Sequence, residues 1–325
     1  MNTINWGIIG CGDVTEVKSG PAFNKVKNSS LVAVMRRDAA KAEDYARRHK
    51  VPKWYSKAAD LIQDPDVNAI YVATPPSSHE EYTIAALKAG KPVYVEKPMS
   101  VDAASAQRMV NAAKETKQRL AVAHYRRAQP LFSKIKQLID EKAIGDTRIV
   151  RLDTYKKTFS KAEFADPGRA WRVNTAESGG GIFHDLAPHQ LDLMYYFFGE
   201  PVKVSGIATN QGKVHEADDI VAGNIVFKSG AVFNGVWNFN APPSEEKDYC
   251  EIIGEKGKIG FSFFEHKPIS ITIDGKQETV TFDPLPHVQQ PMIEKVVKYF
   301  LGEGPNPCSG EEGVEVMTLI DQFTR

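Results

Sequence analysis

The first 124 residues alternate short apolar runs with helical patterns, and this alternation constrains the fold more than any other feature. The runs are rich in β-branched residues, which is typical of strands that are buried on both faces of a parallel sheet. Helices that connect such strands cover the two faces of the sheet. We therefore predict a doubly wound parallel sheet, with strands at 4–10, 31–35, 69–74, 92–96 and 119–124 and helices at 39–50, 79–90 and 100–118.

The sequence GCGDVT, residues 10–15, follows the first strand. In a dinucleotide-binding turn the first glycine makes a tight bend and the second lets the backbone approach a pyrophosphate. Thr15 stands where the third glycine of this pattern is expected, which is a departure from it. The position directly after an N-terminal strand still favours a Rossmann domain. The candidate cofactor-binding residues in the turn are Gly10, Gly12, Asp13 and Val14.

Two arginines, Arg36 and Arg37, follow the second strand. A domain that binds NAD usually places a carboxylate here for the ribose 2'-hydroxyl. Guanidinium groups suit a 2'-phosphate instead, because they form forked, charge-assisted hydrogen bonds with phosphate oxygens. The alternative is that both arginines are solvated charges at the start of a helix. We predict NADP as the cofactor, with NAD as the second possibility.

The second half of the chain has a different pattern of consecutive strands joined by short turns, many of which contain glycine. This pattern predicts an open, mostly antiparallel sheet that carries helices on one face. The fold class is therefore α/β plus α+β, with a dinucleotide-binding domain at 1–124 and a substrate-binding and oligomerisation domain at 125–325. The predicted strands of the second domain are 147–157, 202–209, 219–227, 231–239, 248–254, 258–263 and 269–274.

Apolar and aromatic side chains are frequent in two adjacent strands of this second sheet. They either cover an outer face that pairs with another copy of the chain or pack into the core. We predict a homodimer or homotetramer formed through this sheet. The residues concerned are Val226, Phe227, Val232, Phe233, Val236 and Trp237.

Composition limits the partners that the protein can have. The 41 Lys and Arg residues balance the 41 Asp and Glu residues, and no long run of one sign suggests a nucleic-acid or membrane surface. The three cysteines are far apart and lack CxxC spacing, which disfavours a disulfide framework. We found neither a leader pattern nor eighteen consecutive apolar residues. These features predict a cytoplasmic protein with a small-molecule partner, no nucleic-acid partner and no membrane partner.

The stretch GGGIFHDLAPHQLDLM, residues 179–194, places Asp185, His189 and Asp192 at spacings of four and three. On a helix these three side chains share one face. A solvated polar stripe is the plain interpretation, and an acid–base site is the alternative. Two carboxylates and one imidazole without further ligands are weak evidence for a metal, so we predict no metal site.

Three longer stretches resemble one enzyme family. They are WGIIGCGDV, then AIYVATPPSSHEEYTIAALKAGKPVYVEKPMS with its EKP motif at 96–98, and ESGGGIFHDLAPHQLDLMYYFFGEP with its glycine-rich DxxxH. Nearly the whole chain is similar to the Gfo/Idh/MocA family of glucose-fructose oxidoreductase, inositol dehydrogenase and rhizopine-catabolism oxidoreductases. The resemblance implies an NAD(P)-dependent dehydrogenase or reductase that acts on CH–OH groups of a sugar, a sugar derivative or a cyclic polyol.

The resemblance also implies an active-site trio, which is matched here by Lys97, Asp185 and His189. An imidazole with an ordinary pKa near 6.5 can accept a hydroxyl proton at neutral pH, whereas lysine, near 10.4, normally stays cationic. We assign His189 as the acid/base, Asp185 as the group that orients it and Lys97 as the cation beside the substrate oxygen. The roles of Lys97 and His189 are exchanged if Lys97 is desolvated enough to titrate near 7.

Further positions follow from the resemblance, apart from His184, which is adjacent to Asp185 and would point elsewhere on a helix. A cis Lys97–Pro98 bond is expected in the EKP motif. His184 is interpreted as a structural or substrate-lining residue. Cofactor contacts are implied for Thr74, Pro75, His79, Glu96 and Lys97, and substrate contacts for Tyr125, Trp171, Arg172 and His189.

Two other functions remain open at this point. Some relatives are glycosidases that use tightly held NAD to oxidise C3 transiently and eliminate the aglycone, so that turnover produces no net NAD(P)H. Other proteins with this fold are nonenzymatic ligand sensors that regulate transcription. The complete set of Lys97, Asp185 and His189 argues against a sensor, which does not need all three.

Overall fold

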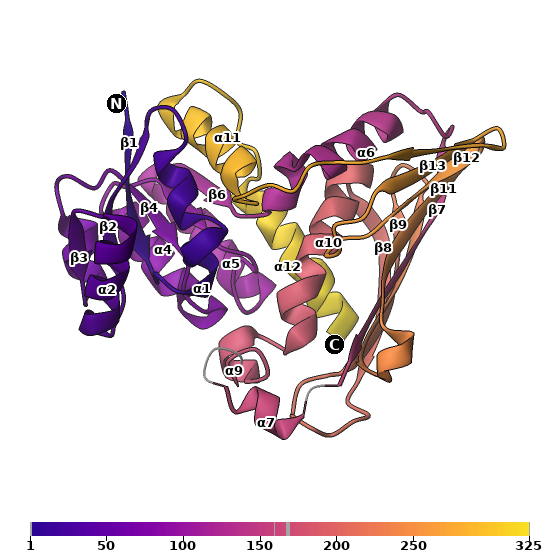
Figure 1. Ribbon diagram of the computed structural model, residues 1–325, viewed down its shortest axis with the longest axis horizontal. Helices are drawn as coiled ribbons and strands as arrows, with labels where there is room; N and C mark the ends of the chain where they lie inside the picture. Colours follow the sequence, from indigo (N-terminus) through magenta and orange to yellow (C-terminus); the bar gives the residue numbers. More distant parts are fainter. Residues whose placement is uncertain (1, 159, 167–169, 325) are drawn as a thin grey trace. The chain divides into compact units, whose positions relative to one another are not determined.

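The computed structural model describes residues 2–158, 160–166 and 170–324 and divides the chain into two compact units (Figure 1). The first unit combines Met1–Gln129 with Leu285–Met317, and the second combines Pro130–Pro284 with Thr318–Arg325.

The first unit contains a six-stranded parallel sheet with the strand order β3-β2-β1-β4-β5-β6. This order confirms the predicted doubly wound parallel sheet. The sheet also contains β3, which the sequence analysis did not predict because this strand is too short and too polar to form an apolar run. The strands are β1 (Ile4–Ile9), β2 (Ser29–Met35), β3 (Lys53–Tyr55), β4 (Ala69–Val72), β5 (Val93–Val95) and β6 (Leu120–Val122).

Two helices of this part of the chain begin at an aspartate that caps them. Asp38 caps α2 by accepting a hydrogen bond from Lys41 N at 3.2 Å, and Asp102 caps α5 by accepting one from Ser105 N at 2.7 Å. The elements are α1 (Asp13–Val17), η1 (Gly20–Asn24), α2 (Ala39–His49), α3 (Ala58–Gln63), η2 (Pro76–Ser78), α4 (His79–Lys88), α5 (Ala103–Thr116) and η3 (Tyr125–Ala128).

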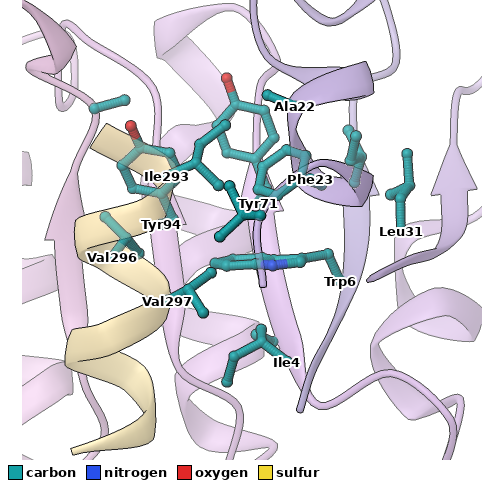
Figure 2. Packing of buried hydrophobic residues seen from close by; sticks show 14 of the residues in the cluster. Ile4, Trp6, Ala22, Phe23, Leu31, Tyr71, Tyr94, Ile293, Val296 and Val297 are labelled. Carbon is teal, nitrogen blue, oxygen red and sulfur yellow. The ribbon is translucent and has the colours of Figure 1, made fainter. Parts of the chain in front are cut away.

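Helix α11 (Gln290–Leu301) also belongs to the first unit, although it lies far along the chain. Ile293, Val296 and Val297 on this helix belong to the same buried cluster as Trp6 of β1, and Val297 lies beside the Trp6 ring (Figure 2). The predicted boundary at 124/125 therefore differs from the observed division. Its cause is long-range apolar packing, which brings residues 285–317 back to the core of the parallel sheet and leaves no local sequence signal.

The second unit contains an eight-stranded sheet with the order β14-β13-β12-β11-β7-β10-β9-β8. Strands β7 and β10 pair in parallel and all other neighbours are antiparallel, which confirms the mostly antiparallel prediction. The strands are β7 (Thr147–Lys157), β8 (Pro201–Thr209), β9 (Ile220–Phe227), β10 (Val232–Ala241), β11 (Lys247–Gly254), β12 (Gly257–Phe261), β13 (Ile269–Ile273) and β14 (Lys276–Val280).

Helices α6 and α10 lie along one face of this sheet (Figure 1). Helix α12 begins in the first unit and ends in the second, where Phe323 contacts Trp237 at a ring-centroid distance of 5.9 Å. The helical elements are α6 (Pro130–Asp140), α7 (Lys161–Phe164), α9 (Thr175–Ser178), α10 (Ile182–Phe198), η4 (Pro243–Glu245) and α12 (Gly310–Thr324).

The aromatic side chains of β9 and β10 point into the core rather than outward. Phe227, Phe233 and Trp237 are buried, whereas Val226 and Val236, which alternate with them, are only half-buried. This decides between the two interpretations of the aromatic residues in favour of core packing. The opposite face of the sheet carries half-buried valines, the exposed Ile207 and Tyr249, and polar side chains.

Within the described ranges, no helix has the length and apolar character that a membrane crossing needs.

Candidate active site

The glycine-rich turn after β1 has two glycines with different tasks. Gly10 has φ +96°, and a Cβ there would lie 2.7 Å from Thr74 Cγ2 and 2.8 Å from the carbonyl carbon of Ala73. Only glycine therefore fits this bend. At Gly12 the nearest atom to an added Cβ is the Gly10 oxygen at 4.0 Å. The backbone at Gly12 is thus open to a close-approaching group, which fits the pyrophosphate of a dinucleotide.

Thr15 is accommodated without the third glycine of the pattern. It is completely buried, and its Oγ1 donates to the Gly12 oxygen at 2.8 Å, while its own carbonyl accepts from Tyr45 Oη at 2.8 Å.

Cys11 in the same turn is buried, and burial raises the pKa of its thiol to about 11. Cys11 is therefore a neutral filler of the turn at physiological pH.

The two arginines after β2 have different surroundings. Arg36 is half-buried and donates from Nη1 to the Cys11 carbonyl at 3.3 Å, which places its guanidinium beside the glycine-rich turn. Arg37 is exposed and directly precedes Asp38, the cap of α2. Arg36 is thus the better candidate for a nucleotide contact, and Arg37 fits the alternative of a solvated charge at a helix start.

His79 lies behind the loop that carries Thr74 and Pro75. Its imidazole is completely buried, with Nε2 2.7 Å from the Thr74 oxygen and Nδ1 3.0 Å from the Pro98 oxygen. Burial lowers its pKa. Both ring nitrogens thus lie against carbonyl oxygens of the protein, so His79 holds this loop against the EKP segment and is poorly placed for the direct cofactor contact that the resemblance implied.

The EKP segment is held by a buried carboxylate. The Lys97–Pro98 bond is cis, as predicted. The carboxylate of Glu96 accepts hydrogen bonds from Tyr71 Oη, from Gln289 Nε2 at 2.6 Å and from the backbone N–H of Lys97 at 3.1 Å. These donors compensate the cost of burying the Glu96 side chain. The same bonds fix the backbone of Lys97.

Tyr125, a predicted substrate contact, opens η3 and is largely buried in the hydrophobic core of the first unit. The Arg126 guanidinium lies 5.6 Å from the centroid of its ring. The packing of Tyr125 is therefore well defined, and only a small part of its surface is accessible to a substrate.

The triple glycine forms the junction between α9 and α10 in the second unit. Gly179, with φ +90°, ends α9, and Gly181, with φ +89°, precedes α10. A Cβ on Gly181 would lie 2.4 Å from Ala217 Cβ. Ser178 Oγ accepts a hydrogen bond from the Gly181 N–H at 2.9 Å. The junction thus fixes the first turn of the helix that carries Asp185 and His189.

The predicted acid–base residues lie along α10. His189 is buried, and the ring of Phe264 meets its imidazole edge-on at a centroid distance of 5.9 Å. Asp185 is half-buried, and one of its oxygens lies 2.9 Å from Nε of Arg172. The Arg172 guanidinium in turn lies 4.7 Å from the centroid of the Trp171 ring. Arg172 and Asp185 were both predicted as site residues, but the ion pair between them was not.

Sequence reasoning missed the group that anchors α10. Gln190, directly after His189, accepts from Trp237 Nε1 at 2.6 Å and donates to Thr154 Oγ1 at 2.6 Å. All three residues are buried, so these hydrogen bonds replace bonds to water and fix the helix on β7 and β10. The one local signal is a glutamine within an otherwise apolar helix face.

His184 is a structural residue. It is buried, and its ring lies on Gly180, where a Cβ would be 2.1 Å from His184 Cε1. Burial lowers its pKa to about 4. This environment fits the structural interpretation of His184 better than the substrate-lining one.

The predicted site residues fall into two groups, one in each unit. The first unit contains the glycine-rich turn, Arg36, the Thr74–Pro75 loop, Glu96, Lys97 and Tyr125, and the second contains Trp171, Arg172, Asp185 and His189. Among the residues that the structure describes, no group of three or more His, Cys, Asp or Glu side chains could hold a metal ion.

Two family profiles match the chain. Residues 4–124 match "Oxidoreductase family, NAD-binding Rossmann fold", and residues 132–260 match "GFO/IDH/MocA C-terminal domain". The chain therefore belongs to the Gfo/Idh/MocA family of oxidoreductases, and its first unit has the NAD-binding Rossmann fold of that family.

Individual relatives agree with this assignment. Oxidoreductase P35 of Formosa agariphila is 47% identical over 98% of both chains. The 1,5-anhydro-D-fructose reductase of Ensifer adhaerens is 27% identical over 95% of this chain and 92% of its own length. The solved structure of a levoglucosan dehydrogenase in complex with NADH and levoglucosan superposes with a TM-score of 0.88, at 23% identity over 99% of this chain and 96% of that one. At this identity the superposition supports the fold alone.

The low pKa of His184 predicts an acid-sensitive contribution to stability. The unfolded chain, with an imidazole pKa near 6.5, takes up a proton before the folded chain does, so this contribution is complete above pH 6.5 and decreases as the pH falls toward 4. Between pH 8 and pH 5 the loss is about 2 kcal/mol. Urea denaturation of His184→Leu should show a correspondingly smaller pH dependence than the wild type.

The exposed His266 provides the control. His266→Gln should keep the pH dependence of the wild type. An equal pH dependence in His184→Leu and the wild type would contradict this account.

Proposed function

We propose that the protein is an NADP-preferring oxidoreductase that interconverts a secondary carbinol and a ketone in a sugar, a sugar derivative or a cyclic polyol. Membership of an NAD-binding oxidoreductase family and the named activities of its relatives support this reaction class. The observation that carries the proposal is the buried imidazole of His189 on a helix that Gln190 fixes to the sheet. A proton acceptor in a defined position is what oxidation of a hydroxyl group requires.

The residues of the first unit hold the cofactor in this proposal. The open backbone at Gly12 receives the pyrophosphate, together with Gly10, Asp13 and Val14, and Arg36 binds the 2'-phosphate. Thr74 and Pro75 border the ribose and the nicotinamide. When bound, the nicotinamide ring supplies the two-electron acceptor that no amino-acid side chain provides.

In this proposal the residues of the second unit transfer the proton and contact the substrate. His189 removes the hydroxyl proton as the carbonyl forms and returns it in the opposite direction. The family resemblance assigns Lys97 to the same reaction, as the cation that stabilises negative charge on the substrate oxygen. Asp185, paired with Arg172, keeps negative charge near the imidazole, and the Trp171 ring offers an apolar surface to a polyol.

Substitution of the proposed catalytic groups tests this function directly. Lys97→Met and His189→Asn should each lower turnover roughly a hundredfold to ten-thousandfold, because each removes a group that acts on the reacting hydroxyl. NAD(P)H formation with a panel of sugars and cyclic polyols measures the effect, and circular dichroism checks the fold.

The control for these variants is His266→Gln, which should retain full turnover. A loss of tenfold or less in both Lys97→Met and His189→Asn, with intact folds, would overturn the assignment. Substrate conversion without net NAD(P)H change, with nucleotide that stays bound through purification, would instead favour the glycosidase reaction.

Cofactor preference is tested at the two arginines. Arg36→Ala should weaken NADPH binding about tenfold to a hundredfold and change NADH binding little, because a charge-assisted contact to phosphate contributes roughly 1.5–3 kcal/mol. Arg37→Ala, at the exposed neighbouring position, should change both affinities little. Fluorescence titration of nucleotide-free protein measures both. Equal affinity of the wild type for NADH and NADPH would contradict the NADP preference.

We further propose that the protein forms a dimer or tetramer through the face of the eight-stranded sheet opposite α10. One row across this face combines Ile207, Ala222, Val236, Asp153 and Tyr249. Ile207 is 73% exposed in the isolated chain and Tyr249 is 37% exposed.

A cytoplasmic location is also proposed, because the cysteine spacing does not suit a disulfide framework.

Size-exclusion chromatography with light scattering tests the oligomer. The wild type should remain associated at micromolar concentration, and Ile207→Asp should dissociate, because it places a charge within an apolar contact. Trp54→Lys, at an exposed apolar residue of the first unit, should behave like the wild type. A monomeric wild type would rule out this interface.

A further inference from the structure

One carboxylate in the second unit fixes the segment between β12 and β13. Asp248 of β11 is buried and accepts three consecutive backbone N–H groups, from Phe263 at 3.2 Å, Phe264 at 2.6 Å and Glu265 at 3.0 Å. Ser262 Oγ also donates to the Asp248 carbonyl at 2.7 Å. Charge-assisted hydrogen bonds of this kind are stronger than neutral ones, so the segment is held in one backbone conformation.

The two phenylalanines in this segment have different environments. Phe263 is buried and packs on Phe132 of α6 and Phe261 of β12, at centroid distances of 5.7 and 5.2 Å. Phe264 is only half-buried, and its ring meets the imidazole of His189 at an interplanar angle of 69°. Phe263 therefore anchors the segment in the core, whereas Phe264 extends the site around His189.

A half-buried aromatic ring beside an acid–base group discriminates among possible substrates. The ring of a pyranose or a cyclitol has an apolar face of C–H groups, which packs well on an aromatic ring. An open-chain polyol has no fixed apolar face and loses more conformational entropy when it adopts one. The surroundings of His189 thus favour cyclic substrates over acyclic ones.

We propose that Phe264 is a specificity-determining residue that contacts the apolar face of a cyclic sugar or cyclitol whose reacting hydroxyl lies at His189. Asp248 is a positioning residue in this proposal, because it acts on the substrate only through the backbone of Phe264. The proposal rests on the proposed function, since it takes His189 as the acid–base group.

The test compares substitutions at the two adjacent phenylalanines. Phe264→Leu keeps an apolar side chain but removes the aromatic face. It should lower kcat/KM for cyclic substrates such as D-glucose and myo-inositol about tenfold relative to kcat/KM for acyclic D-sorbitol, mainly by raising KM. Phe263→Leu should lower the melting temperature and leave this ratio unchanged.

The positioning role of Asp248 needs a readout beyond stability. Asp248→Asn should lower the cyclic-to-acyclic ratio in the same direction as Phe264→Leu. In the double variant Asp248→Asn/Phe264→Leu the ratio should fall no further than in Phe264→Leu alone, because both changes act through the same ring. Independent, additive effects on the ratio would contradict the positioning role.

Measurements of ligand binding test the role of Phe264 independently of the proposed reaction. Isothermal titration of wild type and Phe264→Leu with D-glucose and myo-inositol, in the presence of NADPH, measures affinity without turnover. If no sugar is oxidised but a cyclic ligand binds the wild type more tightly than the variant, the proposed reaction is wrong and the role of Phe264 stands. Equal binding to both proteins, no cyclic ligand bound by the wild type, or an unchanged cyclic-to-acyclic ratio in Phe264→Leu would overturn the role of Phe264.

Discussion

The first unit depends most on the hydrogen bonds that the buried carboxylate of Glu96 accepts. It accepts hydrogen bonds from Tyr71 of β4, from the backbone of Lys97 after β5 and from Gln289 at the start of α11. Loss of any one donor leaves a buried acceptor with fewer bonds, which costs more than the net value of the hydrogen bond itself. One side chain thus joins the parallel sheet, the proposed catalytic lysine and a segment that is 193 positions away.

The second unit follows the same principle with different groups. His189 is followed directly by Gln190, whose amide is fixed by Trp237 and Thr154 in the core. In both units a buried polar side chain that is satisfied within the fold stands next to a residue with a proposed chemical role, as Glu96 does beside Lys97. Such neighbours restrict the backbone of the reactive residue, and this restriction supports the preorganisation that catalysis needs.

The features that the sequence predicted are those with local causes. The parallel strands follow from periodicity, and the bend at Gly10 follows from a φ angle that favours glycine. Strand β14 was missed because its residues are mostly exposed and polar at the edge of the sheet. Three other features were missed because they join positions that are distant in sequence. They are the membership of α11 in the first unit, the hydrogen bond from Gln289 to Glu96 and the hydrogen bonds from the segment after β12 to Asp248. A single sequence contains no local signal for such contacts.

The central claim is that a carbon-bound hydrogen of a sugar or cyclic polyol moves to the nicotinamide. The most direct test supplies carbon-deuterated sugars and cyclitols with NADP⁺ or NAD⁺ and determines the isotope content of the reduced nucleotide by mass spectrometry. The account predicts one deuterium per reduced nicotinamide, transferred from the carbinol carbon. Conversion of the substrate with no deuterium in the nucleotide, or no conversion of any sugar or cyclitol, would contradict it.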